Sequence, residues 1–357
     1  MKRLFLHIGQ SKTGTSFIQR CLRLQSPELA RFDISYPERR DESPEHADSR
    51  ISSGNGRDLL STPREFSRSI ERCAHSLLFS SEFLFEELIG MDDPSWIPEI
   101  ASDHGFESVE VLMFVRNPLG HAASVWQQGV KRGGLSGPID DIFATFDAPE
   151  RALRVLRRLR AADFAMTVSN YSRVDSVVAV VEHWLGVPPG VLATEEPSVN
   201  RSLTFAETEL QLALNRALGE SASIVADLLI ERLPDLEPYE RRPSLAVQEE
   251  AWARMLPAIT DFASEVPVEA HYECDIRADL PNGDGRFDAE QLDIVAEAVA
   301  LMIESARRSG AESALARTHA AEEALRQAGS PEQSRSTVGR RLSVLRRALL
   351  RPPRREV

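Results

Sequence analysis

Apolar residues in the first half of the chain fall into short continuous runs separated by amphipathic stretches. Four runs predict buried strands, at 4–8, 76–81, 109–115 and 164–168. Helical spacing of apolar residues follows these runs, at 17–22, after 82, and at 121–130, 149–160 and 176–185. Continuously apolar strands that alternate with helices are typical of a parallel sheet covered on both faces. The pattern therefore predicts an α/β fold with three layers around a central parallel sheet.

The second half of the chain is mostly helical by its spacing. Residues 288–291 form a capping-box pattern that predicts a helix to about residue 308. The expected organisation is an α/β domain at 1–308, a C-terminal helix at 309–328 and a basic amphipathic tail at 329–357.

Composition narrows the classes of protein that the chain can represent. The formal net charge of −13 over 357 residues argues against broad nucleic-acid binding, which needs a basic face. No run approaches the roughly 20 apolar residues of a membrane-spanning helix. The three cysteines, Cys21, Cys73 and Cys274, are far apart and lack metal-ligand spacing, which suits a reducing compartment. We therefore expect a cytoplasmic protein that holds no metal.

The end of the chain has the opposite charge to the rest. From residue 335 onward there are eight arginines and one glutamate, and leucine and valine are interspersed among them. A basic amphipathic segment of this kind can lie on an anionic membrane surface. The tail at 335–355 is thus a candidate for peripheral contact with the inner membrane face, and a solvated terminus is the alternative.

The connection between the first strand and the first helix has the frame of a phosphate-binding loop. Gly9, Gly14 and Ser16 match the pattern G-x-x-x-x-G-K-[ST], but Thr15 fills the lysine slot and Lys12 stands three residues earlier. The glycines permit a tight turn whose N–H groups face an anion at the helix N-terminus. Because the chain has only three lysines, Lys12 is expected to have a specific role. An ordinary strand–turn–helix connection is the alternative.

A second phosphate contact is expected after the third apolar run. Arg116 ends this run, and Ser124 follows eight residues later in the next helix. An arginine at the carboxyl end of a strand in an open α/β sheet can hold a phosphate through two hydrogen bonds. The alternative is an arginine at the sheet edge and a serine that faces solvent. P-loop kinases and GTPases usually place an Asp here to hold Mg²⁺, so Arg116 and the displaced lysine count against that class.

Lys12-Thr13-Gly14-Thr15-Ser16 resembles the 5′-phosphosulfate loop of sulfotransferases that use 3′-phosphoadenosine 5′-phosphosulfate (PAPS). The pair of Arg116 and Ser124 resembles the one with which that family grips the 3′-phosphate. The resemblance covers residues 1 to about 205. It implies a P-loop-like fold and sulfuryl transfer from PAPS to a hydroxyl without a metal, with PAP as the product. It also implies that the loop residues 12–16 bind the 5′-phosphosulfate.

Two later segments resemble the same family more loosely. Asn170-Tyr171-Ser172-Arg173-Val174 resembles a segment in which a tyrosine contacts the nucleotide, although Ser172 replaces the usual acidic residue. Tyr171 suits an interface tyrosine with a buried ring equally well. Arg201 is a candidate for a late contact with the 3′-phosphate. The alternative for that segment is a helix N-terminus capped by Thr204.

Sulfuryl transfer to a hydroxyl needs a base for the acceptor proton and positive charge at the leaving phosphate. Lys12 is the candidate for the second role. Glu82, directly after the second strand, is the candidate base, and Glu86 and Glu87 are the neighbouring carboxylates that compete with it. His7 lies inside the first strand, and it is either a core histidine or an alternative base.

The acceptor is not identified by these motifs. A small molecule, a carbohydrate, a lipid headgroup and a protein tyrosine all stay open, and the polar stretch 33–63 is expected to help form the pocket. Trp126 is expected in the core. Lys131, before the predicted helix stop at Gly133, is open between binding an anionic acceptor and complementing the helix dipole. The alternatives to an active sulfotransferase are a P-loop kinase or NTPase and a non-catalytic protein that binds PAP or PAPS.

Overall fold

The computed structural model describes residues 1–38, 54–71, 73–193, 201–281 and 286–327, with side chains as far as residue 308. The chain divides into two compact units, Met1–Arg286 and Phe287–Val357. The expected boundary at residue 308 thus falls within the second unit, inside a continuous helix. The basic tail at 335–355 and much of the polar stretch 33–63 lie outside the described residues.

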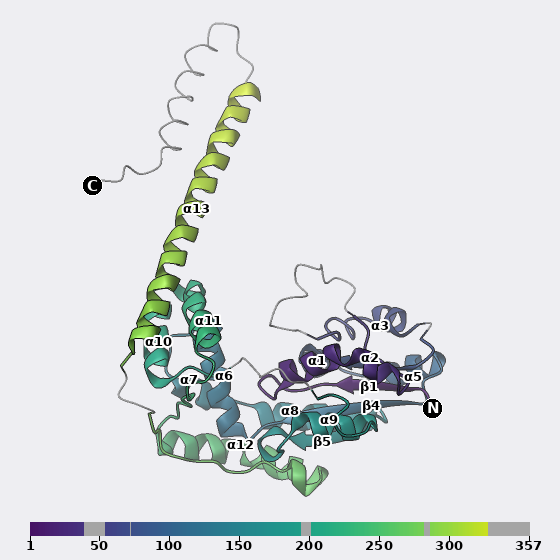
Figure 1. The fold of residues 1–357 in the computed structure, drawn as a ribbon. Coiled ribbons are helices and arrows are strands. Elements are labelled where there is room, and N and C mark those ends of the chain that lie inside the picture. Colours follow the sequence, from purple (N-terminus) through teal and green to yellow (C-terminus); the bar gives the residue numbers. More distant parts are fainter. Residues whose placement is uncertain (39–53, 72, 194–200, 282–285, 328–357) are drawn as a thin grey trace, which may run out of the picture. The chain divides into compact units, whose positions relative to one another are not determined.

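Five parallel strands form one sheet in the first unit, in the order β2-β3-β1-β4-β5 (Figure 1). They are β1 (Arg3–His7), β2 (Ile34–Ser35), β3 (Ser76–Ser80), β4 (Ser108–Val115) and β5 (Ala165–Asn170). In β1, Leu6 lies opposite Phe79 of β3 on one side and opposite Val111 of β4 on the other. Since all strands run the same way, their carboxyl ends share one edge of the sheet.

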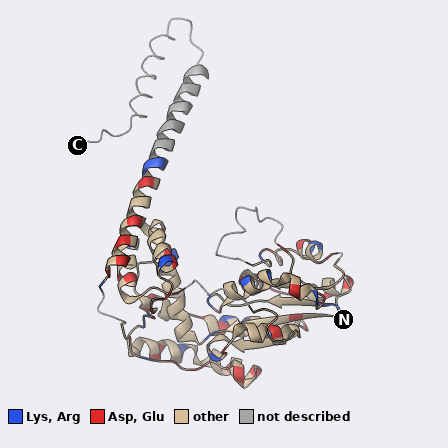
Figure 2. Cartoon of the chain, viewed as in Figure 1, with Lys and Arg blue, Asp and Glu red and all other residues tan. Residues whose placement is uncertain are grey.

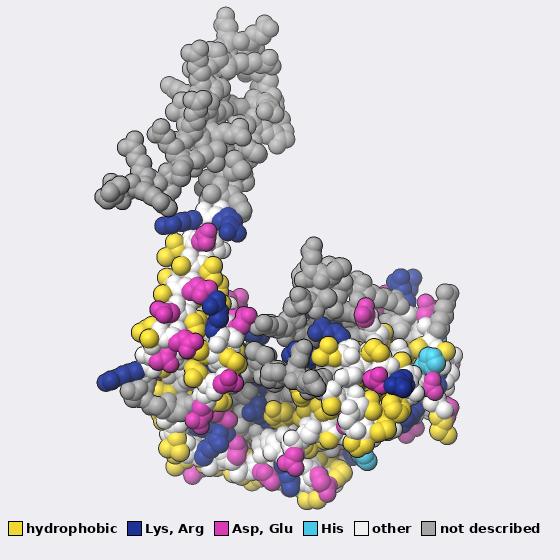
Figure 3. Space-filling view, in the orientation of Figure 1, with side chains coloured by type: hydrophobic (Ala, Val, Ile, Leu, Met, Phe, Trp, Pro, Cys, Tyr) yellow, Lys and Arg dark blue, Asp and Glu magenta, His cyan; other side chains and the backbone are white. Residues whose placement is uncertain are grey.

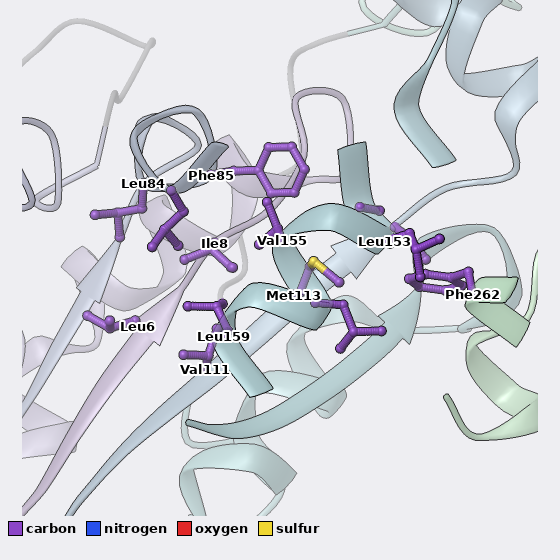
Figure 4. Packing of buried hydrophobic residues seen from close by; sticks show 14 of the residues in the cluster. Leu6, Ile8, Leu84, Phe85, Val111, Met113, Leu153, Val155, Leu159 and Phe262 are labelled. Atoms are coloured by element: carbon purple, nitrogen blue, oxygen red, sulfur yellow. The ribbon is translucent and has the colours of Figure 1, made fainter. Parts of the chain in front are cut away.

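Helices cover both faces of the sheet, so the unit has the three layers that the sequence predicts. One face packs on α1 (Thr15–Leu24), α2 (Ser26–Ala30) and α9 (Val177–Leu185). The other packs on α3 (Pro63–Ile70), α4 (Phe83–Gly90), α5 (Trp96–Asp103), α8 (Ala148–Ala161) and α12 (Leu245–Glu265). Figure 4 shows this second layer, where side chains of β1 and β4 meet those of the helices: Leu6, Ile8, Val111, Met113, Leu84, Phe85, Leu153, Val155, Leu159 and Phe262.

Side-chain alternation along β1 explains why both faces are apolar. Leu4 and Leu6 belong to one buried cluster, whereas Phe5 between them belongs to the other. All three are fully buried. A strand with apolar side chains on both faces is stable only when both faces are covered, which is the case for a sheet between two helical layers.

The four predicted strands are confirmed as β1, β3, β4 and β5, and their ends differ by at most two residues from the prediction. The helices predicted at 17–22, 121–130, 149–160 and 176–185 are α1, α6 (Pro118–Arg132), α8 and α9. The edge strand β2 was not predicted, because two residues carry no periodic pattern. No helix in the described part of the chain is long and apolar enough to cross a membrane.

Four further elements surround α6. They are α7 (Ile139–Thr145), α10 (Phe205–Leu218), the short turn η2 (Gly219–Ala222) and α11 (Ser223–Arg232). Of these, α7, α10 and α11 pack directly against α6. Two more short turns follow β5 and α12, namely η1 (Tyr171–Arg173) and η3 (Val268–Ala270). As predicted, α6 ends at Arg132 with Gly133 as its C-cap, and Trp126 is a core residue whose Nε1 donates to the carbonyl of Gly137 at 3.1 Å.

Where the polar stretch returns to the fold, it docks against β3. Asn55 donates from Nδ2 to the carbonyls of Pro37 and Leu78, both at 3.0 Å, and its Oδ1 accepts from the N–H of Ser80 at 2.8 Å. Gly54 has a positive φ of 72°, and a Cβ there would overlap the carbonyl oxygen of Ser80. Only glycine allows so close an approach. The stretch therefore returns beside the carboxyl end of β3.

The second unit is built on one helix, α13 (Ala289–Gln327). The capping box at its start is confirmed, since Asp288 Oδ1 accepts from Gln291 N–H at 2.8 Å and Gln291 Oε1 accepts from Asp288 N–H at 3.1 Å. Acidic side chains recur along its first turns (Figure 2). Apolar side chains are also exposed along it (Figure 3), namely Leu292, Val299, Leu301 and Ile303.

Candidate functional site

The sequence-predicted site residues follow four adjacent strands at the same edge of the sheet. The loop of residues 9–14 follows β1, Glu82 follows β3, Arg116 follows β4 and Tyr171 follows β5. Because β1 lies in the middle, with β2 and β3 on one side and β4 and β5 on the other, the strand order reverses beside it. In open α/β sheets such a reversal is where ligands bind.

The loop after β1 leaves its backbone N–H groups available to an anion. Lys12 and Gly14 both adopt a left-handed conformation, with φ of 67° and 79°. A lysine rarely does so, and this kind of backbone strain is concentrated at functional sites. Helix α1 then begins at Thr15 with no side-chain cap and no acidic residue in its first turn. Its N-terminal N–H groups and positive dipole end thus have the properties of an anion site.

Gly9 makes room for two hydroxyls within this loop. A Cβ on Gly9 would lie 2.6 Å from Oγ1 of Thr15 and 2.9 Å from Oγ1 of Thr13. Thr13 is fully buried and donates from its hydroxyl to the carbonyl of Gln10 at 2.6 Å. The hydroxyl of Thr13 therefore shapes the loop, while Ser16 at the helix start is only half-buried.

Lys12 points from the loop to helix α6, where its Nζ donates to Oε1 of Gln128 at 3.1 Å. Burial lowers the pKa of Lys12, and the charges of Arg116 and Arg132 lower it further, while Glu82 acts in the opposite direction. A buried ammonium close to two guanidinium groups is destabilised by repulsion, and a bound anion would relieve it.

Glu82 is the carboxylate that faces Lys12. It lies half-buried at the N-cap of α4, and its side chain accepts no capping hydrogen bond. Burial raises the pKa of Glu82, and the charge of Lys12 partly offsets this effect. A carboxyl group with a raised pKa beside a cation suits proton transfer near neutral pH.

The three alternatives to Glu82 as the base, Glu86, Glu87 and His7, make other contacts. Glu86 forms an ion pair with Arg151, and Glu87 accepts from the N–H groups of Asp58 and Leu60 at 3.0 and 2.8 Å. His7 is fully buried and its Nδ1 lies 2.7 Å from Oγ of Ser80. Burial lowers the pKa of His7 to about 3. Its position matches a core histidine, and Glu82 remains the candidate base.

Arg116 supports the loop and faces the same edge. Its Nη1 donates to the carbonyl of Lys12 at 3.0 Å, and its Cζ lies 5.5 Å from the ring centroid of Tyr171. Burial lowers the pKa of Arg116. Ser124 is half-buried on α6, and its hydroxyl has no hydrogen-bond partner among the described residues. Both groups therefore retain donors for a ligand.

Tyr171 closes the loop from the side of β5. A Cβ on Gly14 would lie 3.0 Å from Cε2 of the Tyr171 ring, so the ring covers the left-handed glycine. The neighbouring Ser172, which replaces an acidic residue of the family pattern, accepts from the N–H of Asn117 at 3.1 Å. Asn170 donates to Oδ1 of Asn117 at 2.9 Å. These bonds tie the ends of β4 and β5 together and fix the position of Tyr171.

Arg201 has no donor left for a phosphate. Its side chain is 5% exposed and pairs with Glu207, whose side chain is 0% exposed, at 2.6 Å between Nη1 and Oε2. The remaining partners are the second carboxylate oxygen and the carbonyls of Ser202, Leu229 and Leu233. An arginine has five N–H donors, and all five are occupied here. The resemblance makes Arg201 a phosphate contact, whereas in the structure its guanidinium is held by Glu207 and by backbone carbonyls. Thr204 caps α10 in a full capping box with Glu207, which is the alternative that the sequence also allowed.

Replacing Glu207 by glutamine should lower the free energy of unfolding by about 3–5 kcal/mol, because it leaves the Arg201 charge buried and unpaired. Urea unfolding followed by circular dichroism measures the change. Glu209→Gln is the matched control, since Glu209 lies on the same helix in an exposed pair with Arg241 and should change the value by less than about 1 kcal/mol. Equal stability of the two variants would contradict the structural role of the Arg201–Glu207 pair.

Sequence reasoning missed two polar residues that α6 presents to the loop. His121 Nε2 donates to the carbonyl of Ser11 at 2.7 Å, and Gln128 accepts from Lys12. Burial lowers the pKa of His121 to about 3, so this imidazole is neutral. The seven-residue spacing of His121 and Gln128 places them on one side of the helix, and that spacing was the available signal.

A buried ionic cluster near Arg116 was also missed. Arg242 pairs with Glu240 and with Asp275, each at 2.6 Å. A Cβ on Gly120 would lie 3.1 Å from Oδ2 of Asp275, so the cluster packs directly on the first turns of α6. These residues are more than 100 positions from the loop after β1 in sequence, and no local pattern connects them to it.

Comparison with protein-family models, with curated proteins and with solved structures finds no match for this chain. The proposal of a function therefore depends on the motif resemblance of residues 12–16 and on the geometry of the site. Within the described residues, no group of three or more His, Cys, Asp or Glu side chains is arranged to hold a metal ion.

Proposed function

We propose that the protein is a sulfotransferase that moves a sulfuryl group from PAPS to an acceptor hydroxyl, on a P-loop-like fold. The observation that carries the proposal is the juxtaposition of Lys12, Glu82 and Arg116 at the carboxyl ends of three adjacent strands. Burial is the largest cause of the lowered pKa of both Lys12 and Arg116. Two partly desolvated cations therefore face this edge of the sheet, and their charged forms are destabilised. An anionic ligand with two charged ends would offset that cost.

The residues present fit the two phosphate ends of PAPS. The backbone of residues 13–16 at the uncapped start of α1, together with Lys12, would hold the 5′ end. Arg116 and Ser124, which retain hydrogen-bond donors, would hold the 3′-phosphate. Tyr171, next to both Gly14 and Arg116, would cover the nucleotide between them.

PAPS supplies a sulfuryl group that is activated by its link to the 5′-phosphate. Glu82 accepts the proton of the acceptor hydroxyl as the acceptor oxygen bonds to sulfur. Lys12 neutralises the charge that grows on the phosphate oxygen as the old sulfur–oxygen bond breaks, which completes the in-line displacement. Gln128 holds the ammonium of Lys12 in place from α6.

The proposed location of this reaction is the cytoplasm. Cys21, Cys73 and Cys274 are all free thiols, which agrees with a reducing compartment. We propose a small molecule or a carbohydrate as the acceptor, and a panel that also includes a lipid headgroup and a tyrosine peptide tests this choice.

Calorimetric titration with PAP tests the proposal. The wild type should bind PAP, and Arg116→Ala should weaken binding about 10- to 100-fold, because a hydrogen bond to a charged group contributes about 1.5–3 kcal/mol. Arg154→Ala is the control, since Arg154 is exposed on α8. It should bind like the wild type.

Titration with ATP and Mg²⁺ in parallel separates the proposal from its main rival. Binding of ATP–Mg²⁺ without binding of PAP would identify a nucleotide-triphosphate enzyme instead. Binding of PAP, followed by transfer from labelled PAPS to a member of an acceptor panel, would separate an enzyme from a non-catalytic PAP-binding protein.

A further inference from the structure

The lysine of the loop after β1 has no helix of its own to orient it. In the pattern G-x-x-x-x-G-K-[ST] the lysine directly follows the second glycine, at the start of the next helix. Lys12 instead precedes Gly14, and α1 begins only at Thr15. Loop segments are more mobile than the elements that they connect. The position of the Lys12 ammonium therefore depends on contacts from other parts of the fold.

Those contacts come from the connection of β4 to α6 and from α6 itself. Arg116, directly after β4, donates from Nη1 to the carbonyl of Lys12 at 3.0 Å. His121, in the first two turns of α6, donates from Nε2 to the carbonyl of Ser11 at 2.7 Å. Further along the helix, Gln128 accepts from the ammonium of Lys12 at 3.1 Å. The backbone and the side chain of one residue are thus held from one side.

The two backbone bonds fix both dihedral angles of Lys12. The carbonyl of Ser11 belongs to the peptide group before the Cα of Lys12, and the carbonyl of Lys12 belongs to the peptide group after it. With both peptide groups held, neither φ nor ψ of Lys12 is free to turn. Its φ of 67° lies in the left-handed region, which a lysine rarely adopts and which persists only where the surroundings impose it.

The same bonds determine the direction of the loop N–H groups. In a trans peptide the carbonyl of one residue and the N–H of the next point in opposite directions, and the described residues contain no cis peptide. Because the carbonyls of Ser11 and Lys12 point to Arg116 and His121, the N–H groups of Lys12 and Thr13 point away from them. No N–H group of residues 12–16 has a hydrogen-bond partner among the described residues, so all are available to an anion.

His121 has the properties of a fixed neutral donor. It is 3% exposed, and its ring packs edge-on against that of Phe146 with 5.1 Å between the centroids. Its Nδ1 is buried without a hydrogen-bond partner among the described residues, so the polar contact of the ring is the one to Ser11. Burial, together with the charges of Arg116 and Lys12, lowers the pKa of His121 to about 3. The imidazole therefore holds the loop without adding a third cation beside Lys12 and Arg116.

We propose that His121 is a positioning residue for sulfuryl transfer, whose bond to the carbonyl of Ser11 fixes the backbone of Lys12 and thereby the place of its ammonium at the leaving phosphate. This inference rests on the proposed sulfotransferase function. His121 is buried beside the loop and acts only through Lys12. Its loss leaves Arg116 and the start of α1 to bind the nucleotide, but frees the ammonium from its place.

The first test compares His121→Leu with His121→Gln. The leucine variant should lower kcat for PAP formation from labelled PAPS about 10- to 100-fold, because a shift of about 1 Å in a catalytic group can have an effect of this size. Its affinity for PAP should fall less than about fivefold, because one N–H group at most loses its direction. Glutamine provides a neutral N–H donor that can reach Ser11, so it should restore most of the rate.

Two further variants complete this comparison. His121→Asn carries the same amide one methylene shorter, which cannot reach Ser11, and it should behave like the leucine variant; it replaces that variant if leucine prevents folding, as judged by circular dichroism. His104→Leu is the matched control, since it removes a histidine contact to Ser67 of 2.8 Å at the opposite edge of the sheet, and it should keep the wild-type kcat. Equal rates in the glutamine and asparagine variants would contradict the proposed role.

A second test asks whether His121 acts through Lys12. In a Lys12→Met background, His121→Leu should cause less than a twofold further loss of single-turnover rate, because the ammonium that it positions is already gone. A histidine that only supports the fold would lower the rate by the same factor in both backgrounds. That result would overturn the inference and leave the proposed sulfotransferase function intact.

The position of Lys12 can also be followed without PAPS. Lysine labelled with ¹³C at its ε carbon gives three signals, one for each lysine of the chain, and Lys12→Met identifies the relevant one. Burial and the charges of Arg116 and Arg132 lower the pKa of Lys12. In an NMR titration this pKa should rise toward its ordinary value in His121→Leu and stay lowered in His121→Gln.

Failure of the inference and failure of the proposed function therefore give different results. If the wild type neither binds PAP nor uses PAPS, the proposed function fails, and the titration alone decides whether His121 positions Lys12. An unchanged pKa of Lys12 in His121→Leu would overturn the positioning role whether or not PAPS is used. Turnover of PAPS with a wild-type kcat in His121→Leu would do the same, while the sulfotransferase proposal would stand.

Discussion

Replacing Lys12 by methionine should lower the release of PAP from labelled PAPS about 100- to 1,000-fold. Methionine keeps the length of the side chain but removes the only ammonium that the loop brings to the leaving phosphate, and loss of one such charge-stabilising donor has an effect of this size. The N–H groups at the start of α1 and Arg116 stay in place, so PAP binding should weaken by a smaller factor than turnover. Single-turnover measurement of PAP formation separates the two effects.

Lys2→Met is the matched control for this experiment. Lys2 precedes β1 at the opposite edge of the sheet, where its Nζ donates to the carbonyl of His104 at 2.8 Å and lies 3.9 Å from the ring centroid of Phe106. Its loss should affect stability slightly and turnover not at all. Equal turnover in Lys12→Met and the wild type would remove Lys12 from the chemistry and with it the displaced-lysine interpretation of the loop.

The sheet could be predicted because its strands are apolar on both faces. Phe5 points to one layer and Leu4 and Leu6 to the other, so β1 appears in the sequence as an unbroken apolar run. The same holds for the later part of β4, from Val111 to Val115. The edge strand β2 has two residues and, in the described part of the chain, pairs with β3 alone, so its formation depends on tertiary contacts that no local pattern expresses.

The candidate site could be predicted in part, for a related reason. Short motifs that follow parallel strands are brought to one edge by the topology, so the loop after β1, Glu82 and Arg116 meet although they are far apart in sequence. What surrounds them depends on contacts between distant segments. Arg201 was assigned from a loose resemblance, and only the structure shows that Glu207, six residues later, occupies its guanidinium.

Helix α6 is a second case in which the sequence predicts an element but not the contacts that the element makes. The sequence predicts this helix over 121–130 with a stop at Gly133, and the structure has it from Pro118 to Arg132 with Gly133 as its C-cap. Which of its residues face Lys12 depends on how α7, α10 and α11 pack against it. Gln128 could therefore be recognised as the partner of Lys12 only once the packing was known.

Replacing Glu82 by glutamine should lower kcat/KM for sulfuryl transfer about 100- to 10,000-fold and abolish its dependence on pH in the acidic range. In the wild type the base must be ionised, and burial raises the pKa of Glu82 above its ordinary value. The rate should thus rise with pH through that raised pKa and level off above it. Initial rates with labelled PAPS between pH 4.5 and 8 measure the profile.

The direction of the pKa shift also predicts what happens to stability. A carboxyl group whose pKa is raised by folding favours the folded state when protonated, and this contribution is lost as the pH rises through the raised pKa. Glu82→Gln should therefore be at least as stable as the wild type at pH 8, so a lost rate cannot be attributed to unfolding. Glu86→Gln is the matched control, because Glu86 lies on the same helix in an ion pair with Arg151 and should keep the wild-type profile. A wild-type rate that stays flat down to pH 4.5 would instead favour His7, whose pKa is lowered to about 3, and would exclude Glu82 as the base.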